Sequence, residues 1–416
     1  MRIVVDLHIH SSYSRATSED MSLKTLDRVA MMKGINVLGT GDFTHPKWRE
    51  KLKELMKEED NLYGIEGGNT KFIISGEVCT NFEYDGKIRR IHHLILLPSI
   101  DIAEELSRRL ATYGDLEVDG RPNLSMSGAQ LVEEVVEFGE DCLVIPAHIW
   151  TPWFSLFGDR GGVNKIEECY EDQTPHIYAL ETGLSSDPPM NWRVSALDSY
   201  TLVSNSDSHS PLKIGREANI IEVNEVSYRE IVNAIMFHKE KVTTIEVDPA
   251  YGKYHWTGHR KCGISMPPKD SIRIKGICPI CGKRMTKGVA ERVEELADRA
   301  EGESPRNRQN FIRLLPLNDL IAASIDRYPF SNDVQKAYWE IVGKIGSEFK
   351  VLLEAPKEEL ERVCSKEIVE LILMNRENKI SIIPGYDGVY GKIKLFGIEF
   401  KRPKTLEDYM EGENDA

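Results

Sequence analysis

Short apolar segments alternate with stretches of helical period through about the first 245 residues of the chain. Segments of this kind, rich in β-branched residues and bounded by polar ones, are typical of buried strands. Seven of them are found: Ile3–Val5, Val37–Gly39, Phe72–Ile74, His93–Leu97, Leu143–Pro146, Ile177–Leu180 and Thr201–Val203. Strands that alternate with helices over this length predict an α/β barrel or a doubly wound sheet.

Two of the intervening helices have recognisable ends. Ser22 can cap a helix whose apolar positions fall on one face, and Gly34 can stop it. Ser127 and Gly139 bracket a second helix in the same way. The helical period returns at Val289, so the chain is expected to continue as a mostly helical region that ends in a Gly-rich hairpin or cap.

Charge divides the chain into three parts. Residues 1–250 carry 25 Lys and Arg against 41 Asp and Glu, residues 251–290 carry 9 against 1, and residues 291–416 carry 19 against 25. The net charge of −14, which at first argues against a nucleic-acid partner, is therefore an average over parts of opposite sign. We expect a barrel over 1–250, a basic module over 251–290, and a mostly helical C-terminal domain over 291–416 with a small Gly-rich cap and an acidic tail.

Composition excludes several classes of protein. With 41% hydrophobic and 29% charged residues the chain reads as globular rather than disordered or fibrous. No apolar run approaches the roughly 20 residues of a membrane span, and no targeting segment is evident, so we expect a cytoplasmic protein without a membrane partner. Seven cysteines are too few and too scattered for a disulfide scaffold.

Residues that can bind metal ions follow the predicted strands. Because strand ends converge on one rim of a barrel, such residues become neighbours in space. Residues two apart on a strand also point to one side, so both imidazoles of His8-Ile-His10 can reach one ion. Mixed imidazole and carboxylate ligands suit zinc, manganese, iron or cobalt better than calcium. The candidates are Asp6, His8, His10, Asp42, His45, Glu77, His92, His93, His148, Asp207 and His209.

Each candidate has an alternative role. A lone histidine such as His148 or His45 is more often a core or surface residue, but five such clusters at strand ends are hard to explain without a shared site. Only one of His92 and His93 can face inward, and we favour His93. Asp6 could orient a histidine rather than bind metal, and Glu181 could be a ligand or a structural acceptor.

The sequence shows no Ser-His-Asp order, phosphate-binding P-loop or dinucleotide-binding glycine motif. Two or three divalent metals without a protein nucleophile indicate a hydrolase of phosphoesters that uses metal-activated water. Zinc, manganese and magnesium are the candidate ions, and His8, His10, Glu77 and Asp207 are the catalytic candidates.

The metal-binding segments resemble the PHP family, named for polymerase and histidinol phosphatase. Residues 6–10, 40–45, 146–148 and 206–209 are similar to its four motifs, although Asp42 and His45 are three apart where the family usually has an adjacent pair. The resemblance implies a distorted (β/α)7 barrel with up to three ions. It implies one ion held by His8, His10, Glu77 and Asp207, a second held by Glu77, His93 and His148, and a third held by His45 and His209.

The basic module carries a second candidate metal site. Cys278-Pro-Ile-Cys281 is a knuckle in which two thiolates can hold one ion, and His259 and Cys262 complete a His-x2-Cys-x15-Cys-x2-Cys pattern. This pattern predicts a structural zinc site, with His255 as an alternative fourth ligand. A redox-active CxxC is the competing interpretation, which the third nearby cysteine disfavours.

Basic and aromatic residues are interleaved around this module, a composition typical of surfaces that bind phosphate backbone and unstacked bases. The loop after His148 adds further aromatic residues beside the predicted metals. As structural alternatives, the basic residues of the module could form an ordinary solvated face, and the aromatic residues after His148 could pack into the rim of the barrel. Our candidates for DNA or base contact are Trp150, Trp153, Phe154, Lys261, Lys283 and Arg284.

A PHP barrel followed by a Cys-rich basic module and a helical domain resembles the endonuclease Q family of DNA repair enzymes over essentially the whole chain. The resemblance implies nicking on the 5′ side of deaminated bases (hypoxanthine, uracil, xanthine) and of abasic sites, with the lesion flipped out and metal-activated water as nucleophile. A small-molecule phosphatase of the PHP class is the alternative function. Residues 405–410 partly resemble a clamp-binding box, which makes the sliding clamp a candidate partner.

Overall fold

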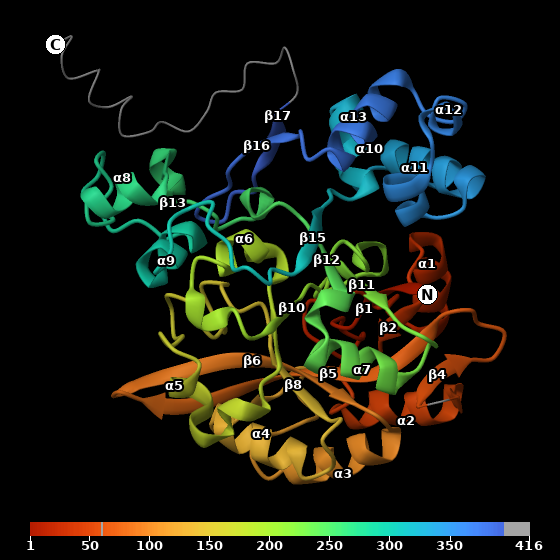
Figure 1. Ribbon diagram of the computed structural model, residues 1–416, viewed down its shortest axis with the longest axis vertical. Coiled ribbons are helices and arrows are strands. Elements are labelled where there is room, and N and C mark those ends of the chain that lie inside the picture. Colours follow the sequence, from red (N-terminus) through yellow and green to blue (C-terminus); the bar gives the residue numbers. More distant parts are fainter. Residues whose placement is uncertain (60, 395–416) are drawn as a thin grey trace.

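The first 250 residues form a curved sheet surrounded by helices (Figure 1). The computed structural model describes residues 1–59 and 61–394. All seven predicted strands are present, four of them with shifted bounds. They are β1 (Arg2–Asp6), β2 (Val37–Gly39), β5 (Lys71–Tyr84), β6 (Lys87–Leu97), β8 (Leu143–Pro146), β9 (Ala179–Glu181) and β10 (Thr201–Val203).

The strand directions are mixed. β1 pairs parallel with β2, and β2 with β5, whereas β5 with β6 and β6 with β8 are antiparallel. β1 also pairs antiparallel with β11 (Ala218–Glu222), which pairs antiparallel with β12 (Val242–Glu246). β9 and β10 form a separate parallel pair, joined to the end of β8 where the Ile149 N–H donates to the Glu181 carbonyl. This arrangement confirms the predicted distorted α/β barrel.

The helices begin where the capping residues predict. The Ser22 hydroxyl accepts a hydrogen bond from the Thr25 N–H, and Gly34 ends the helix with φ of 87°. Ser127 forms a capping box with Gln130, but that helix ends three residues before the predicted stop at Gly139. The helices are α1 (Leu23–Lys33), α2 (Pro46–Leu55), α3 (Ile100–Leu110), α4 (Gly128–Val136), α5 (Glu167–Tyr170), α6 (Pro188–Asn191) and α7 (Tyr228–Phe237).

Strands β5 and β6 are much longer than the sequence pattern predicts. They pair antiparallel from Ile74 with Leu97 to Tyr84 with Lys87, and the hairpin projects at the left of Figure 1. Asp85 and Gly86 form its tip with φ of 53° and 65°, the Asp-Gly chemistry of a tight two-residue turn. Short strands complete the sheet: β3 (Met56–Glu59), β4 (Leu62–Ile65) and β7 (Asn123–Leu124).

The predicted basic module is a small hairpin with one helix. It contains β13 (Thr257–His259), β14 (Ile264–Met266) and α8 (Pro268–Arg273). Its buried apolar cluster consists of only Ile264, Met266, Cys278 and Met285. Such a core is too small to stabilise an independent fold, so a bound metal ion is expected to be required.

The C-terminal region is mostly helical, as predicted. It contains α9 (Val289–Leu296), α10 (Leu317–Ile325), α11 (Asn332–Ile345), a π-helical turn (Lys350–Glu354), α12 (Lys357–Leu360) and α13 (Lys366–Arg376). The predicted hairpin at its end is also present, as β16 (Ser381–Ile383) paired with β17 (Lys392–Lys394). The acidic tail and the candidate clamp-binding box at 405–410 lie outside the described residues.

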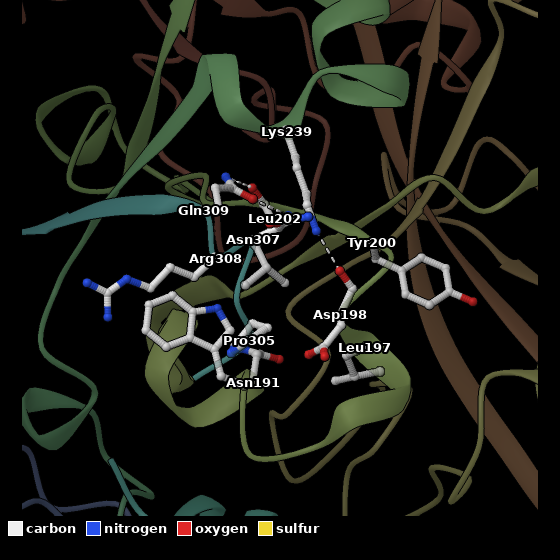
Figure 2. Close-up of a pocket in the computed structure, with 11 residues that line it drawn as sticks. Asn191, Leu197, Asp198, Tyr200, Leu202, Lys239, Pro305, Asn307, Arg308 and Gln309 are labelled. Carbon is white, nitrogen blue, oxygen red and sulfur yellow. Dashed lines mark hydrogen bonds between the residues drawn. The ribbon is translucent and has the colours of Figure 1, made fainter. Parts of the chain in front are cut away.

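This region is joined to the barrel along a packed seam. Strand β15 (Asn310–Arg313) pairs parallel with β12, so the barrel sheet gains a strand from the third predicted part of the chain. Just before it, the Gln309 side-chain amide accepts a hydrogen bond from the Leu202 N–H and donates one to the Leu202 carbonyl (Figure 2). On the barrel side of the seam, Lys239 donates to the Asp198 carbonyl. The cavity at this seam has a volume of about 10 Å³, room for about one water molecule.

A buried ion pair also links the two parts. Lys33 Nζ at the end of α1 lies 2.5 Å from a Glu348 carboxylate oxygen, and both side chains are almost fully buried. Glu348 also accepts hydrogen bonds from the Leu317 N–H and the Tyr338 hydroxyl. Separately, none of the helices in residues 1–59 and 61–394 has the length and apolar character of a membrane span.

Candidate metal centre

A first cluster of four ligand atoms lies at the rim of the barrel. His8 and His10 follow β1, Glu77 lies within β5 and Asp207 follows β10, and their ligand atoms lie within 4.8 Å of one another. His10 Nε2 is 3.0 Å from Asp207 Oδ1 and 3.5 Å from Glu77 Oε2. His8 Nε2 is 3.7 Å from Glu77 Oε1. The structure thus brings together the four residues that the PHP resemblance implies for one ion.

A second cluster shares the Glu77 carboxylate. Glu77 Oε1 lies 2.7 Å from His92 Nδ1 and 2.9 Å from His148 Nε2, and these two nitrogens are 3.3 Å apart. Because Glu77 Oε2 faces His10 while Oε1 faces His92 and His148, this carboxylate can bridge two cations. Glu77 is fully buried, so a charge here requires cationic or protonated partners.

The second cluster corrects one prediction. His93, which we favoured over His92, points to the opposite face of β6. Both of its ring nitrogens have partners there, since Nε2 lies 2.8 Å from the Thr80 hydroxyl and Nδ1 lies 3.0 Å from the Tyr170 hydroxyl. Burial lowers the pKa of His93 to about 3, so it is a neutral core residue.

Carboxylates hold the two histidines of the first cluster in place. Glu181, at the end of β9, lies 3.0 Å from His8 Nδ1, and Asp42 lies 3.0 Å from His10 Nδ1. Each contact fixes the tautomer of the ring and leaves Nε2 to face the cluster, as supporting carboxylates do in many metal sites. Glu181 is therefore a structural acceptor beside the ligands, the second of the two roles considered for it.

The predicted third ligand set does not assemble. Asp42 Oδ1 contacts His10 while Oδ2 accepts hydrogen bonds from Ser11, so this carboxylate supports a ligand. His45 Nε2 lies 3.2 Å from the Glu117 carbonyl, and His209 lies beside the His10 ring at a centroid distance of 4.4 Å. Among residues 1–59 and 61–394, Asp42, His45 and His209 join no cluster of three ligand atoms.

The electrostatics of the site favour cations. Burial alone would lower the pKa of His10, but Asp42 and Asp207 raise it to about 9. Burial likewise opposes ionisation of Glu77, yet the histidines around it hold its pKa well below the usual value. The carboxylates of the cluster therefore attract positive charge strongly. A histidine must lose a proton before it can bind a metal ion, so metal binding is coupled to proton release.

Two observations show that the residues fit divalent metal ions. His8 Nε2 and Glu77 Oε2 are buried and make no hydrogen bond within the part of the chain that the structure describes, although each faces the other ligands. His148 and Asp207 adopt positive φ values of 31° and 45°. Such backbone strain in residues other than glycine is characteristic of functional sites. Imidazole and carboxylate donors in this number suit zinc or manganese.

Sequence reasoning missed Arg121, which enters the site from the loop after α3. Its Nη1 lies 3.6 Å from Glu77 Oε2, and its side chain is 24% exposed. Burial lowers its pKa, but Glu77, Asp207 and other carboxylates outweigh that effect and raise it, so the guanidinium is a fixed positive charge at the mouth of the site. A single arginine in a polar loop has no spacing signal that could have identified it.

The cysteine module assembles with the ligands that the sequence predicts. His259, Cys262, Cys278 and Cys281 bring their ligand atoms within 4.8 Å of one another, and His259 Nδ1 lies 3.4 Å from Cys281 Sγ. Gly282, with φ of 68°, permits the turn after Cys281. The alternative ligand His255 does not belong to this cluster.

The candidate DNA-contact residues divide into two groups. Trp150 is 1% exposed and its indole N–H donates to Asn191, so the prediction that it contacts DNA is wrong. Trp153 and Phe154 are 40% and 38% exposed, respectively. Three basic candidates of the module also lie on the surface: Lys261, Lys283 and Arg284.

Comparison with known sequences identifies two relatives. A family model described as the MJ0043 C-terminal domain matches residues 316–379. The uncharacterized protein MJ0043 of Methanocaldococcus jannaschii is 35% identical over 269 residues, which cover 63% of this chain and 32% of that protein, so the match spans about a third of its length. The uncharacterized protein YqxK of Bacillus subtilis is 31% identical over 94% of this chain and 99% of its own length.

Two solved structures are similar over nearly the whole chain. The lesion-specific endonuclease PfuEndoQ from Pyrococcus furiosus superposes with a TM-score of 0.85 at 33% identity, covering 99% of both chains. An endonuclease Q in complex with a 27-mer duplex substrate, with an abasic lesion at the active site, has a TM-score of 0.83 at 33% identity. That match covers 98% of this chain and all of the other.

Proposed function

The chain belongs to the endonuclease Q family, and on that premise we propose that it is a metal-dependent DNA endonuclease that nicks one strand at damaged nucleotides. The observation that carries the proposal is the pair of ligand clusters joined by Glu77, with two buried ligand atoms that lack hydrogen-bond partners. Two neighbouring cation sites that share a carboxylate would suit hydrolysis of a phosphodiester.

The cations would supply an activated water molecule and neutralise charge on the phosphate. The protein's own residues orient this site. Glu181 and Asp42 hold His8 and His10 with Nε2 facing inward. Glu77 faces His10 with Oε2 and the second cluster with Oε1. Because the barrel strands fix these side chains, little reorganisation is needed when substrate binds.

Arg121 is suited to bind the phosphate itself. Its guanidinium faces the Glu77 carboxylate, at 3.6 Å. It would thus be placed to pair with an anionic group bound over the clusters. We therefore assign Arg121 the role of orienting the phosphodiester against the metal centre.

The basic module would hold the rest of the DNA. Lys261, Lys283 and Arg284 are exposed on it, and Tyr254 reaches back to the barrel, where its ring lies 5.1 Å from the Trp153 ring. Exposed cations neutralise backbone phosphates without reading sequence. The module therefore contributes affinity, and the barrel rim contributes the chemistry.

We further propose that the substrates are deaminated bases (hypoxanthine, uracil and xanthine) and abasic sites, cut on the 5′ side with the damaged nucleotide flipped out. The related endonuclease solved with an abasic lesion at its active site supports a flipped nucleotide. The resemblance of the whole chain to this family is the support for the deaminated bases.

A nicking assay tests the proposal. A labelled duplex with one deoxyinosine, incubated with the protein and Mg²⁺ or Mn²⁺, should give a single 5′ nick, while the same duplex with deoxyadenosine should stay intact. The His8→Ala and Asp207→Asn variants should bind the duplex but not cut it. Hydrolysis of a phosphomonoester without any nick would instead favour the small-molecule phosphatase.

A further inference from the structure

A candidate site lies near the tip of the β5–β6 hairpin, where Ile88 and Arg90 follow the turn at Asp85 and Gly86. It is a cavity of about 230 Å³ between the hairpin and the loop that follows β8. This volume is below the roughly 300–1,000 Å³ of pockets that enclose drug-sized ligands, and it suits one planar ring system. The cavity is lined by Ile88, Arg90, Trp153, Phe154, Arg160 and Gly161.

The cavity adjoins the second ligand cluster through Phe154. Ile88, Arg90 and His92 are alternate residues of β6, so all three point to the same side of the hairpin. The Phe154 ring stacks on the His92 ring with a centroid distance of 5.1 Å and an interplanar angle of 23°. A nucleotide whose phosphate lies over the metal centre therefore has this cavity as its immediate neighbour.

The aromatic wall is held in place before any ligand arrives. The Phe154 carbonyl accepts a hydrogen bond from the His92 N–H, and the Arg160 N–H donates to the Pro152 carbonyl. Phe154 has a φ of 58°, a strained conformation for a bulky residue. The edge of the Trp153 ring meets the Tyr254 ring of the basic module, which supports it from the other side.

The residues that line the cavity provide aromatic rings for stacking and two arginine charges. None of these side chains has a carboxylate, amide or hydroxyl oxygen that could accept a hydrogen bond. Deamination replaces an exocyclic amine by a carbonyl and creates a ring N–H, so a site that selects a deaminated base needs both a donor and an acceptor in fixed positions. The backbone carbonyls of Pro152, Phe154 and Gly161 already accept backbone hydrogen bonds. The Arg90 side chain is exposed, so its guanidinium can follow a flexible phosphate.

From this geometry we propose that the cavity binds an undamaged, unpaired nucleotide next to the cleaved phosphodiester, with its base stacked on Trp153 and Phe154 and its phosphates beside Arg90 and Arg160. Aromatic stacking with cationic neutralisation binds any base, because every base has a stacking face. The inference rests on the proposed function for the position of the phosphate. In this proposal the cavity helps to hold the two strands apart, and the damaged base is recognised at a different site.

Binding of a lesion-free oligonucleotide tests the inference. The probe is a fluorescein-labelled 12-nucleotide single strand of mixed sequence, titrated with the metal-loaded full chain and followed by fluorescence anisotropy. Trp153→Ala should weaken binding about 5- to 150-fold, the range for loss of one base-stacking contact. The matched control is Tyr328→Ala, which removes a 70% exposed aromatic residue of the helical region and should leave affinity unchanged.

Charge is tested separately. Arg90→Ser should reduce the slope of log affinity against log salt concentration by about 0.7, the value for one phosphate contact on a single strand. Trp153→Ala should leave that slope unchanged. Equal affinities of Trp153→Ala, Arg90→Ser and the parent would overturn the proposal.

A second measurement asks whether the cavity selects the lesion. The ratio of kcat/KM for a deoxyinosine duplex and an abasic-site duplex should be the same in Trp153→Ala as in the parent, although both values fall. A collapse of that ratio would show that the cavity reads the damaged base and would overturn the proposal. If the parent fails to nick any lesion, the proposed function falls, while a loss of single-strand affinity in Trp153→Ala alone still supports this site.

Discussion

Two adjacent histidines of β6 provide a direct test of the metal centre. His92 Nδ1 lies 2.7 Å from Glu77 Oε1, while His93 faces away from it and contacts Thr80 and Tyr170. His92→Phe and His93→Phe make the same change, from imidazole to a ring of similar shape, on opposite faces of one strand. We expect the first variant to lose metal and the second to lose stability.

The magnitude for His92→Phe follows from the number of ligands. Glu77, His92 and His148 are the three groups of the second cluster, so the substitution removes one of three. Loss of a group that only supports a ligand typically weakens metal affinity about 10- to 100-fold. Loss of the ligand itself should therefore cost at least about 1.4–2.8 kcal/mol of binding free energy. The free energy of unfolding should change little, because a phenyl ring can keep the stack on Phe154.

His93→Phe should have the opposite profile. The substitution leaves the buried Tyr170 hydroxyl without its partner at 3.0 Å, while the Thr80 hydroxyl keeps a second contact with the Ile91 carbonyl. An unsatisfied buried polar group costs about 1–3 kcal/mol, so we expect a loss of that size in the free energy of unfolding. Metal affinity should equal that of the parent.

Both quantities can be measured on the same preparations. Metal content is determined by mass spectrometry after equilibration with chelator-buffered Mn²⁺ or Zn²⁺, and stability by urea unfolding followed by circular dichroism. Metal loss in His93→Phe together with parental affinity in His92→Phe would refute the assignment of strand faces. A loss of stability without loss of metal in both variants would refute the role of His92 as a ligand.

Three further predictions concern other parts of the chain. Changing Cys278 and Cys281 together to Ser should remove one zinc per chain, expose the module to proteolysis and weaken DNA binding; Cys364→Ser, outside the cluster, should do none of these. Lys33→Met should cost about 3–5 kcal/mol in urea unfolding, because it leaves a buried carboxylate unpaired, and a loss below about 1 kcal/mol would contradict a buried pair. Burial raises the pKa of Glu246 to about 8, so the folded state binds a proton that the unfolded state releases above about pH 4.5, and stability falls as pH rises toward 8 by up to about 1.4 kcal/mol per pH unit. Glu246→Gln should show a smaller fall between pH 5.5 and 8, and an identical fall would contradict this assignment.

The seven strands of the barrel could be predicted because each is a short apolar run bounded by polar residues, and burial on both faces makes that pattern strong. The cysteine module could also be predicted. Its ligands lie within 23 residues of sequence at spacings that only a metal site explains well, and the structure brings His259 and the three cysteines together.

The choice between His92 and His93 could not be made from sequence alone. It depends on which face of β6 meets Glu77, and that register is fixed by an eleven-pair hairpin whose length the apolar pattern does not show. The Asp-Gly pair at 85–86 was the available signal for this hairpin. An aromatic residue beside a predicted site can contact a ligand or pack into the rim, and the contacts of Trp150 with Asn191 and Phe157 place it in the packed rim.

The net charge of −14 overstates the repulsion that DNA meets at the barrel. Seven carboxylates of the first 250 residues are fully buried, and the net charge counts each as a full negative charge although burial raises the pKa of some and others are paired with arginine or histidine. The seven are Asp6, Asp42, Glu77, Glu181, Asp187, Glu217 and Glu246. Two divalent cations at the clusters would offset four further negative charges where the phosphate binds. The acidic barrel is therefore compatible with a DNA partner that contacts the metal rim, the cavity near the hairpin tip and the basic module.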